Sequence, residues 1–119
     1  MSYCRWSDDN WKSDVYCYAN VSGAWTTHVA GNRVVGDIPE VDWGLLKSDP
    51  DKCWKQYEAQ HDFLKDCERA PIDLPQDGET FDDAGPKEML ERLLWLRGLG
   101  YNVPEFALEE LREEIAEAA

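Results

Sequence analysis

The stretch DVYCYANVSGAWTTHVAGNRVV, residues 14–35, decides the fold class. Residues 15–21 alternate small apolar side chains with tyrosines, which is the period of two that is typical of a strand with one buried face. Residues 25–29 continue the alternation, and residues 33–35 resemble a short third strand; turns rich in Gly, Ser and Asn separate the three. The sequence also allows a strand around residues 3–6. Together these segments predict a β-meander.

Helical patterns occupy the rest of the chain. The triplet Ser48-Asp49-Pro50 joins a capping side chain to a proline in the first turn, so it predicts the start of a helix. Pro71 ends that helix. Further helices begin at Pro86 and Pro104. A short helical turn over residues 42–46 precedes the helix that starts at Pro50.

The order of strands first and helices after predicts the α+β class, with a small antiparallel β-meander of three or four strands followed by three or four α-helices. We expect residues 1–41 to form a β-rich lobe and residues 42–119 an acidic helical lobe, unless the two share one compact domain. Residues 71–85, with their Pro, Gly and Asp, are expected to form a long acidic loop.

The tryptophans are assigned mainly to the core. Trp25, Trp43, Trp54 and Trp95 fit buried positions of the pattern, and His61 falls on the apolar stripe of the helix that starts at Pro50. Trp6 and Trp11 lie among polar residues and do not fit a core position. They are therefore candidates for contact with a partner protein.

Charge is the most informative property of the composition. The chain has 12 Lys and Arg against 25 Asp and Glu, which gives a net charge of −13. Such a protein repels nucleic acid and anionic membranes, so its charge favours basic surfaces, cations or no partner at all. No run of 18 apolar residues is present, and no apolar segment follows Met1, so we expect neither a membrane span nor a secretory signal.

The four cysteines are Cys4, Cys17, Cys53 and Cys67, and no pair has the close spacing of a metal site. Within one helix, Cys53 and Cys67 would lie about 21 Å apart. A disulfide needs Cα atoms within about 7 Å, which excludes that pair. We expect four free thiols, because we expect no secretory signal and the cytosol is reducing. A cysteine nucleophile activated by His28 or His61 is an alternative with no supporting spacing. We therefore expect no enzyme activity, no metal and no cofactor.

The acidic residues allow three interpretations: a calcium site, a solvated surface, or a mimic of nucleic acid. The alternating pattern of a 12-residue calcium loop is absent. In the last helix, glutamates recur every four residues, about 6 Å apart along the axis, and only Arg112 offsets them. The predicted partner-binding residues are Asp73, Asp77, Glu79, Asp82, Asp83, Glu105, Glu109, Glu110, Glu113, Glu114 and Glu117.

Two stretches resemble small phage and prophage proteins. They are MSYCRWS at residues 1–7, continued by DVYCY and WTTHVA, and LRGLGYNVP at residues 96–104. An acidic α+β chain of this size is also similar to anti-CRISPR inhibitors of the type I-C system. Several anti-CRISPR families act as mimics of double-stranded DNA. The similarity to these inhibitors is one of charge and fold class, so it identifies no individual binding residue.

These observations predict a phage-encoded inhibitor of a host defence complex. We expect a monomer, in the cytoplasm of the infected bacterium, that binds the basic DNA-binding surface of a CRISPR effector subunit without binding nucleic acid itself. One alternative is a phage accessory protein that binds a host protein through Trp6, Trp11 and the sheet. The other is a cysteine-dependent enzyme.

Overall fold

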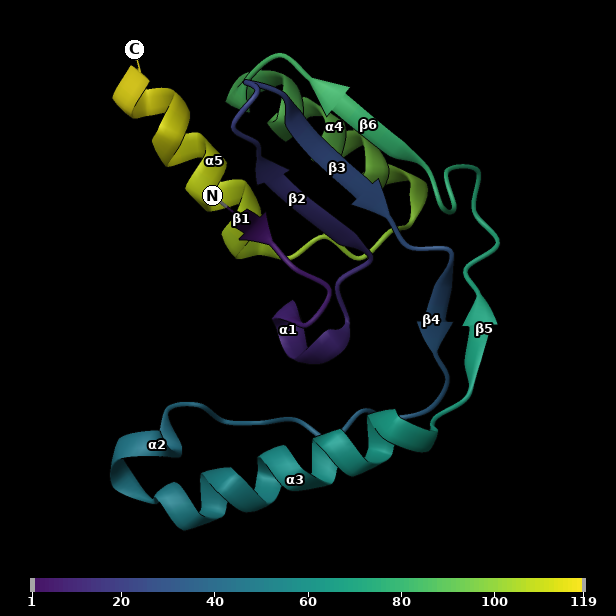
Figure 1. Cartoon of the computed structure of the whole chain (residues 1–119), viewed down its shortest axis with the longest axis vertical. Helices are drawn as coiled ribbons and strands as arrows, with labels where there is room; N and C mark the ends of the chain where they lie inside the picture. Colours follow the sequence, from purple (N-terminus) through teal and green to yellow (C-terminus); the bar gives the residue numbers. More distant parts are fainter. Residues whose placement is uncertain (1, 119) are drawn as a thin grey trace.

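The computed structural model describes residues 2–118 (Figure 1). The elements are β1 (Ser2–Cys4), α1 (Asp8–Trp11), β2 (Val15–Ala19), β3 (Trp25–Val29), β4 (Asn32–Val34), α2 (Leu45–Ser48), α3 (Pro50–Asp66), β5 (Arg69–Pro71), β6 (Thr80–Asp83), α4 (Pro86–Leu99) and α5 (Glu105–Ala118). Antiparallel strands and separate helices confirm the predicted α+β class. No helix among residues 2–118 is long and apolar enough to cross a bilayer.

The main sheet has four antiparallel strands in the order β1-β2-β3-β6. The predicted strands at 15–21 and 25–29 form its centre, with Val15 opposite Val29 and Ala19 opposite Trp25. The fourth strand corrects the expectation of a long loop over 71–85, because β6 pairs with the free edge of β3. Thr80 and Phe81 favour extended structure and supply the local preference for this strand.

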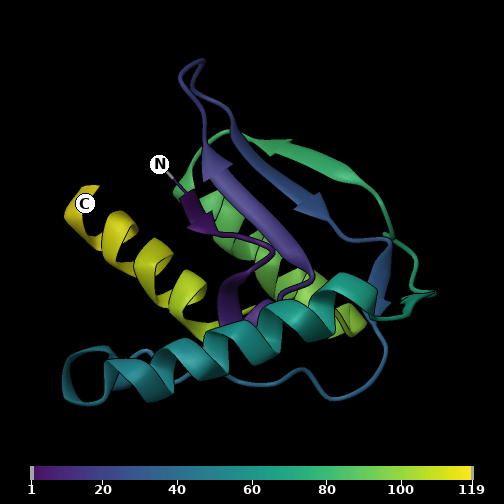
Figure 2. The ribbon, with the colours of Figure 1, turned by 60° about the horizontal axis from the view of Figure 1, so that its bottom comes forward.

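The helices α4 and α5 cover one face of this sheet, as the two ribbon views show (Figure 1, Figure 2). Alternate strand residues point toward them, so Val15, Cys17 and Val29 share a core with helix residues. The fully buried helix residues are Met89, Leu93, Leu96, Ala107, Leu108 and Leu111. Gly100 ends α4 in the left-handed conformation, with φ 112°, and turns the chain toward α5.

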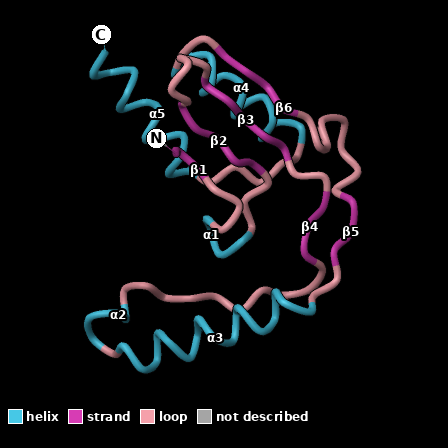
Figure 3. Tube along the Cα trace, in the orientation of Figure 1, coloured by secondary structure: helices cyan, strands magenta, loops and turns pink. Residues whose placement is uncertain are grey.

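The remaining elements form a limb, which we define as residues 32–72; residues 2–31 and 73–118 are the body. In the limb, β4 and β5 pair as a two-stranded ribbon that leads to α2 and α3 (Figure 3). The expectation that residues 33–35 continue the meander was therefore wrong, since β4 leaves the sheet and pairs with β5. The cap of α3 is confirmed, because the Asp49 side chain accepts a hydrogen bond from Lys52 N–H.

The limb is fastened to the body at α1, a turn with unusual backbone angles. Asp9, Asn10 and Trp11 have φ of 55°, 53° and 65°. The left-handed conformation costs about 1–2 kcal/mol per residue. It directs the Asn10 side chain at the limb, where its oxygen accepts hydrogen bonds from Val41 N–H at 3.0 Å and from the Gln60 amide at 3.1 Å. These bonds help to offset the strain.

Most of the aromatic side chains that the sequence assigned to the core are exposed. Trp43 and Trp54 are 57% and 60% exposed, Trp95 is 41% exposed, and His61 is also exposed. Only Trp25 of the four tryptophans packs against the core. The side of α3 that faces the protein is the adjacent stripe with Cys53 and Gln60, so the aromatic stripe faces solvent.

Candidate functional site

The outward face of α5 is the strongest candidate for a binding surface. Helical spacing buries Ala107, Leu108 and Leu111 against the sheet, and the opposite face therefore points to solvent. That face, which we call the α5 acidic face, carries exposed carboxylates and one exposed aromatic ring. Its residues are Phe106, Glu109, Glu110, Glu113 and Glu117.

Nearby arginines do not neutralise this face. Arg97 and Arg112 both bind Glu105, at 2.8 and 3.4 Å. The hydrogen bond from Arg97, more than that from Arg112, lowers the pKa of Glu105. Among residues 2–118, no ion pair reaches any other glutamate of α5. Of the six predicted glutamates, Glu114 is half-buried and Glu105 is paired, which leaves four exposed carboxylates without a cation.

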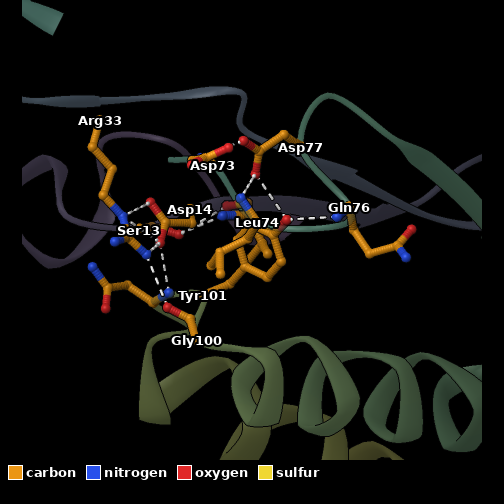
Figure 4. A network of polar contacts seen from close by, with 11 residues as sticks. Ser13, Asp14, Arg33, Asp73, Leu74, Gln76, Asp77, Gly100 and Tyr101 are labelled. Carbon is orange, nitrogen blue, oxygen red and sulfur yellow. Dashed lines mark hydrogen bonds and ion pairs between the residues drawn. The ribbon is translucent and has the colours of Figure 1, made fainter. Parts of the chain in front are cut away.

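The acidic residues of the 73–83 segment are arranged differently, because several stabilise the fold (Figure 4). Asp77 accepts hydrogen bonds from Asp73 N–H, Leu74 N–H and the Tyr101 hydroxyl. Burial, followed by this contact with Asp77, raises the pKa of Tyr101. Gln76 N–H donates to the same hydroxyl at 2.8 Å.

The two aspartates of β6 also have partners within the body. Asp82 accepts a hydrogen bond from the Thr26 hydroxyl at 2.6 Å, and Asp83 forms an ion pair with Arg92 at 3.1 Å. Asp73 and Glu79 are exposed. The segment lies by the β6 edge of the sheet, whereas α5 packs beside β1 at the other edge (Figure 1). The structure therefore does not join the two predicted acidic groups into one surface.

One acidic residue that the sequence analysis did not single out has a central structural role. Asp14 is 2% exposed and pairs with Arg33 at 2.6 Å, and it also accepts a hydrogen bond from Asn102 N–H. Arg33 donates in turn to the Gly100 carbonyl (Figure 4). The hydrogen bond with Asp14 raises the pKa of Arg33. This network joins β4 of the limb to the end of α4, and no local sequence signal identifies it.

Aromatic side chains form a second exposed surface, on the limb. We call it the limb aromatic stripe, and it consists of Trp43, Leu46, Trp54, Tyr57 and His61. The rings of Trp54 and Tyr57 stack with centroids 5.4 Å apart, and Trp43 lies 5.9 Å from Tyr57. Spacing of three and four residues placed Trp54, Tyr57 and His61 on one stripe in the sequence, but did not show that the stripe is exposed.

The face of the sheet opposite the helices holds a smaller aromatic cluster. Tyr16, Tyr18 and His28 are half-buried there, with Trp6 beside Tyr16. The Tyr18 hydroxyl lies 3.1 Å from His28 Nε2, and Thr80 Oγ1 lies 2.9 Å from Nδ1. Both ring nitrogens of His28 therefore have hydrogen-bond partners within the sheet, and neither partner is a cysteine.

A groove of about 600 Å³ lies between body and limb. Trp6 and Trp11 line it, together with three basic and three acidic side chains. The basic ones are Lys12, Arg33 and Arg69, and the acidic ones are Asp14, Asp37 and Glu40. Lys12 binds Glu40 and Arg33 binds Asp14, so most of the charge is neutralised within the groove.

Among residues 2–118, no three His, Cys, Asp or Glu side chains are grouped as metal ligands. Comparison with protein-family models, curated proteins and solved structures finds no match for this chain. The resemblance to phage proteins accordingly stays a prediction.

Proposed function

We propose that the protein is a binding protein that occupies a basic, nucleic-acid-binding surface of another protein through the α5 acidic face. The resemblance to type I-C inhibitors suggests the target, a CRISPR effector complex in the cytoplasm of an infected bacterium. Binding makes and breaks no covalent bond, because the protein acts by excluding DNA from the surface it covers.

One observation carries this proposal: Glu109, Glu113 and Glu117 form an exposed row to which no cation of the described chain is bound. Like charges four residues apart destabilise a helix, and glutamates near its C-terminus also oppose the helix dipole. The row therefore brings no benefit to folding. A basic partner would supply the missing cations.

Phe106 adds an apolar contact to this electrostatic one. It is 40% exposed and lies on the same face as the glutamates. Interfaces commonly place an aromatic side chain at the centre and charged groups around it. The carboxylates would steer the encounter, and the ring would slow dissociation.

The test is displacement of labelled double-stranded DNA from a purified type I-C effector complex. We expect the wild-type protein to displace DNA and the triple variant Glu109→Lys, Glu113→Lys, Glu117→Lys to lose at least tenfold in potency. A control variant, Glu58→Lys, Asp62→Lys, Asp66→Lys, makes the same charge change at the same spacing on α3. It should retain potency within about threefold, because only net charge has changed.

Equal losses in both variants would show a general charge effect and contradict a specific role of α5. Failure of the wild-type protein to displace DNA would exclude this target.

The limb aromatic stripe supports a second candidate function, in which the protein binds its partner through α2 and α3. Trp43 and Trp54 are each more than half exposed, and the rings of both lie against Tyr57. The double variant Trp43→Ala, Trp54→Ala distinguishes the two. If it loses binding while the α5 variant retains it, the limb is the binding surface.

A further inference from the structure

Cys4 and Cys17 lie opposite each other on neighbouring strands. They are register partners in the antiparallel pair of β1 and β2, next to an irregularity between Ser2 and Cys4. Directly opposed residues in such a pair have Cα atoms about 4.5–5.5 Å apart. A disulfide needs about 4.4–6.8 Å, a range that overlaps the separation expected of register partners.

Cys4 and Cys17 are also buried together in the core of the body, at 1% and 0% exposure. Ser13 Oγ lies 3.1 Å from Cys4 Sγ. Cys4 and Cys17 share one core cluster, whereas Cys53 and Cys67 lie at opposite ends of α3.

The surroundings give the two thiols different reactivities. Hydrogen bonds from Cys17 and Ser13 lower the pKa of Cys4, although burial opposes them. The hydrogen bond with Cys4, together with burial, raises the pKa of Cys17. Because ionised thiols react fastest with oxidants, we assign the first reaction to Cys4, whose strand lies at the edge of the sheet.

The position of Cys4 offers a route for an oxidant despite its burial. β1 has three residues, stands at the edge of the sheet and pairs only with β2. Short terminal strands open locally at a much lower free energy than the central ones. Opening of β1 would expose Cys4 while β2 and Cys17 stay in place.

We propose that Cys4 and Cys17 form a reversible disulfide when the protein meets a peroxide. The Cys4 thiolate attacks one peroxide oxygen, the O–O bond breaks, and the leaving hydroxide takes up a proton to become water. Cys4 is then a sulfenic acid. The Cys17 sulfur attacks Cys4 Sγ, the S–O bond breaks, and hydroxide leaves with the Cys17 proton as a second water. Two thiols are oxidised by two electrons, and one hydrogen peroxide is reduced.

The bond would fix the edge of the sheet. β1 packs against α5, and its Tyr3 stacks on Trp25 with ring centroids 5.4 Å apart. A covalent tie from Cys4 to the central strand β2 removes the opening of β1 and stabilises this side of the body. The inference is independent of the proposed function, because it requires no partner.

Peroxide treatment of the folded protein followed by peptide mapping tests the proposal. Trypsin places the four cysteines in separate peptides, namely residues 1–5, 13–33, 53–55 and 66–69. We expect an intact mass lower by two hydrogen atoms, a cross-link between the first two peptides, and its loss with dithiothreitol. Melting temperature should rise by about 5–10 °C in the oxidised form.

Two sets of cysteine variants identify which thiols form the disulfide. The Cys53→Ser, Cys67→Ser protein should still form the cross-link, whereas Cys4→Ser and Cys17→Ser should each prevent it. If Cys67 oxidises to sulfinic acid while Cys4 and Cys17 stay reduced, the proposal is wrong. A cross-link to Cys53 or Cys67, or an oxidised form that melts at or below the temperature of the reduced protein, also overturns it.

Discussion

The body and the limb differ in how they use their side chains. The body has 16 acidic and six basic residues, and it buries its large aliphatic side chains between one sheet and two helices. The limb has nine acidic and six basic residues, and it leaves Trp43, Trp54 and Tyr57 at the surface. The body thus has a net charge of −10 around an apolar interior, while the limb has a net charge of −3 and an aromatic stripe on its surface.

In each region, the side chains that form the core differ from those that are candidates for binding. Carboxylates on α5 bring nothing to the core of the body, and the rings on α3 bring nothing to the core of the limb. We propose that each surface serves to bind a partner. The predictions below test that separation, beginning with the largest expected effect.

Truncating a buried leucine of the body should be far more costly than truncating a limb tryptophan. Leu108 is fully buried, so Leu108→Ala should lower the free energy of unfolding by about 2–5 kcal/mol. Trp54→Ala should cost less than about 0.5 kcal/mol, because the ring is 60% exposed. Urea denaturation of both variants gives the comparison. Similar losses would show that the limb stripe is part of a core.

The junction of the two regions should depend on Asp14. In Asp14→Asn, Arg33 loses its ion pair, and we expect the free energy of unfolding to fall by about 2 kcal/mol. That figure lies below the usual loss for a fully buried pair, because the Arg33 side chain is 38% exposed. Hydrogen exchange should show faster opening of β4 and β5 than of β2. Unchanged exchange in the ribbon would mean that Asp14 does not hold the limb.

A smaller effect is expected at Tyr101, whose hydroxyl binds Asp77 and Gln76 N–H within the body. Tyr101→Phe should cost about 1 kcal/mol near neutral pH. Because the folded-state pKa of Tyr101 is raised, its contribution is complete below the ordinary pKa of 10.0 and is lost as pH rises through the folded value. The difference between wild type and variant should therefore stay constant up to about pH 9 and shrink above about pH 10. A constant difference would contradict this.

The sequence predicted what depends on neighbours in the chain. Alternation identified β2 and β3, Asp49 and Pro50 marked the start of α3, and the four-residue spacing of glutamates identified the α5 acidic face. It missed features that depend on distant segments. Thr80–Asp83 becomes a strand only because β3 has a free edge, and the partnership of Asp14 and Arg33 requires the limb to fold back.

The aromatic stripe of α3 shows the limit most clearly. Its spacing indicates an apolar face, and the usual inference is that such a face is buried. Whether another element covers it is decided by tertiary structure, and here the adjacent stripe with Cys53 and Gln60 faces the protein instead. The pairing of Cys4 with Cys17 was missed for a similar reason, since strand register cannot be read from spacing alone.

The most direct test of the central claim measures stability and partner affinity together in the α5 variant. Melting temperature and affinity for the effector complex are recorded at low and at moderate salt for wild type, the α5 triple lysine variant and the α3 control. We expect the α5 variant to melt at the wild-type temperature or a few degrees higher, since repulsion within the helix is removed. Its affinity should fall most at low salt, where charge attraction is strongest. If its melting temperature rises while its affinity at both salt concentrations equals that of wild type, the α5 acidic face is a solvated surface and the account is wrong.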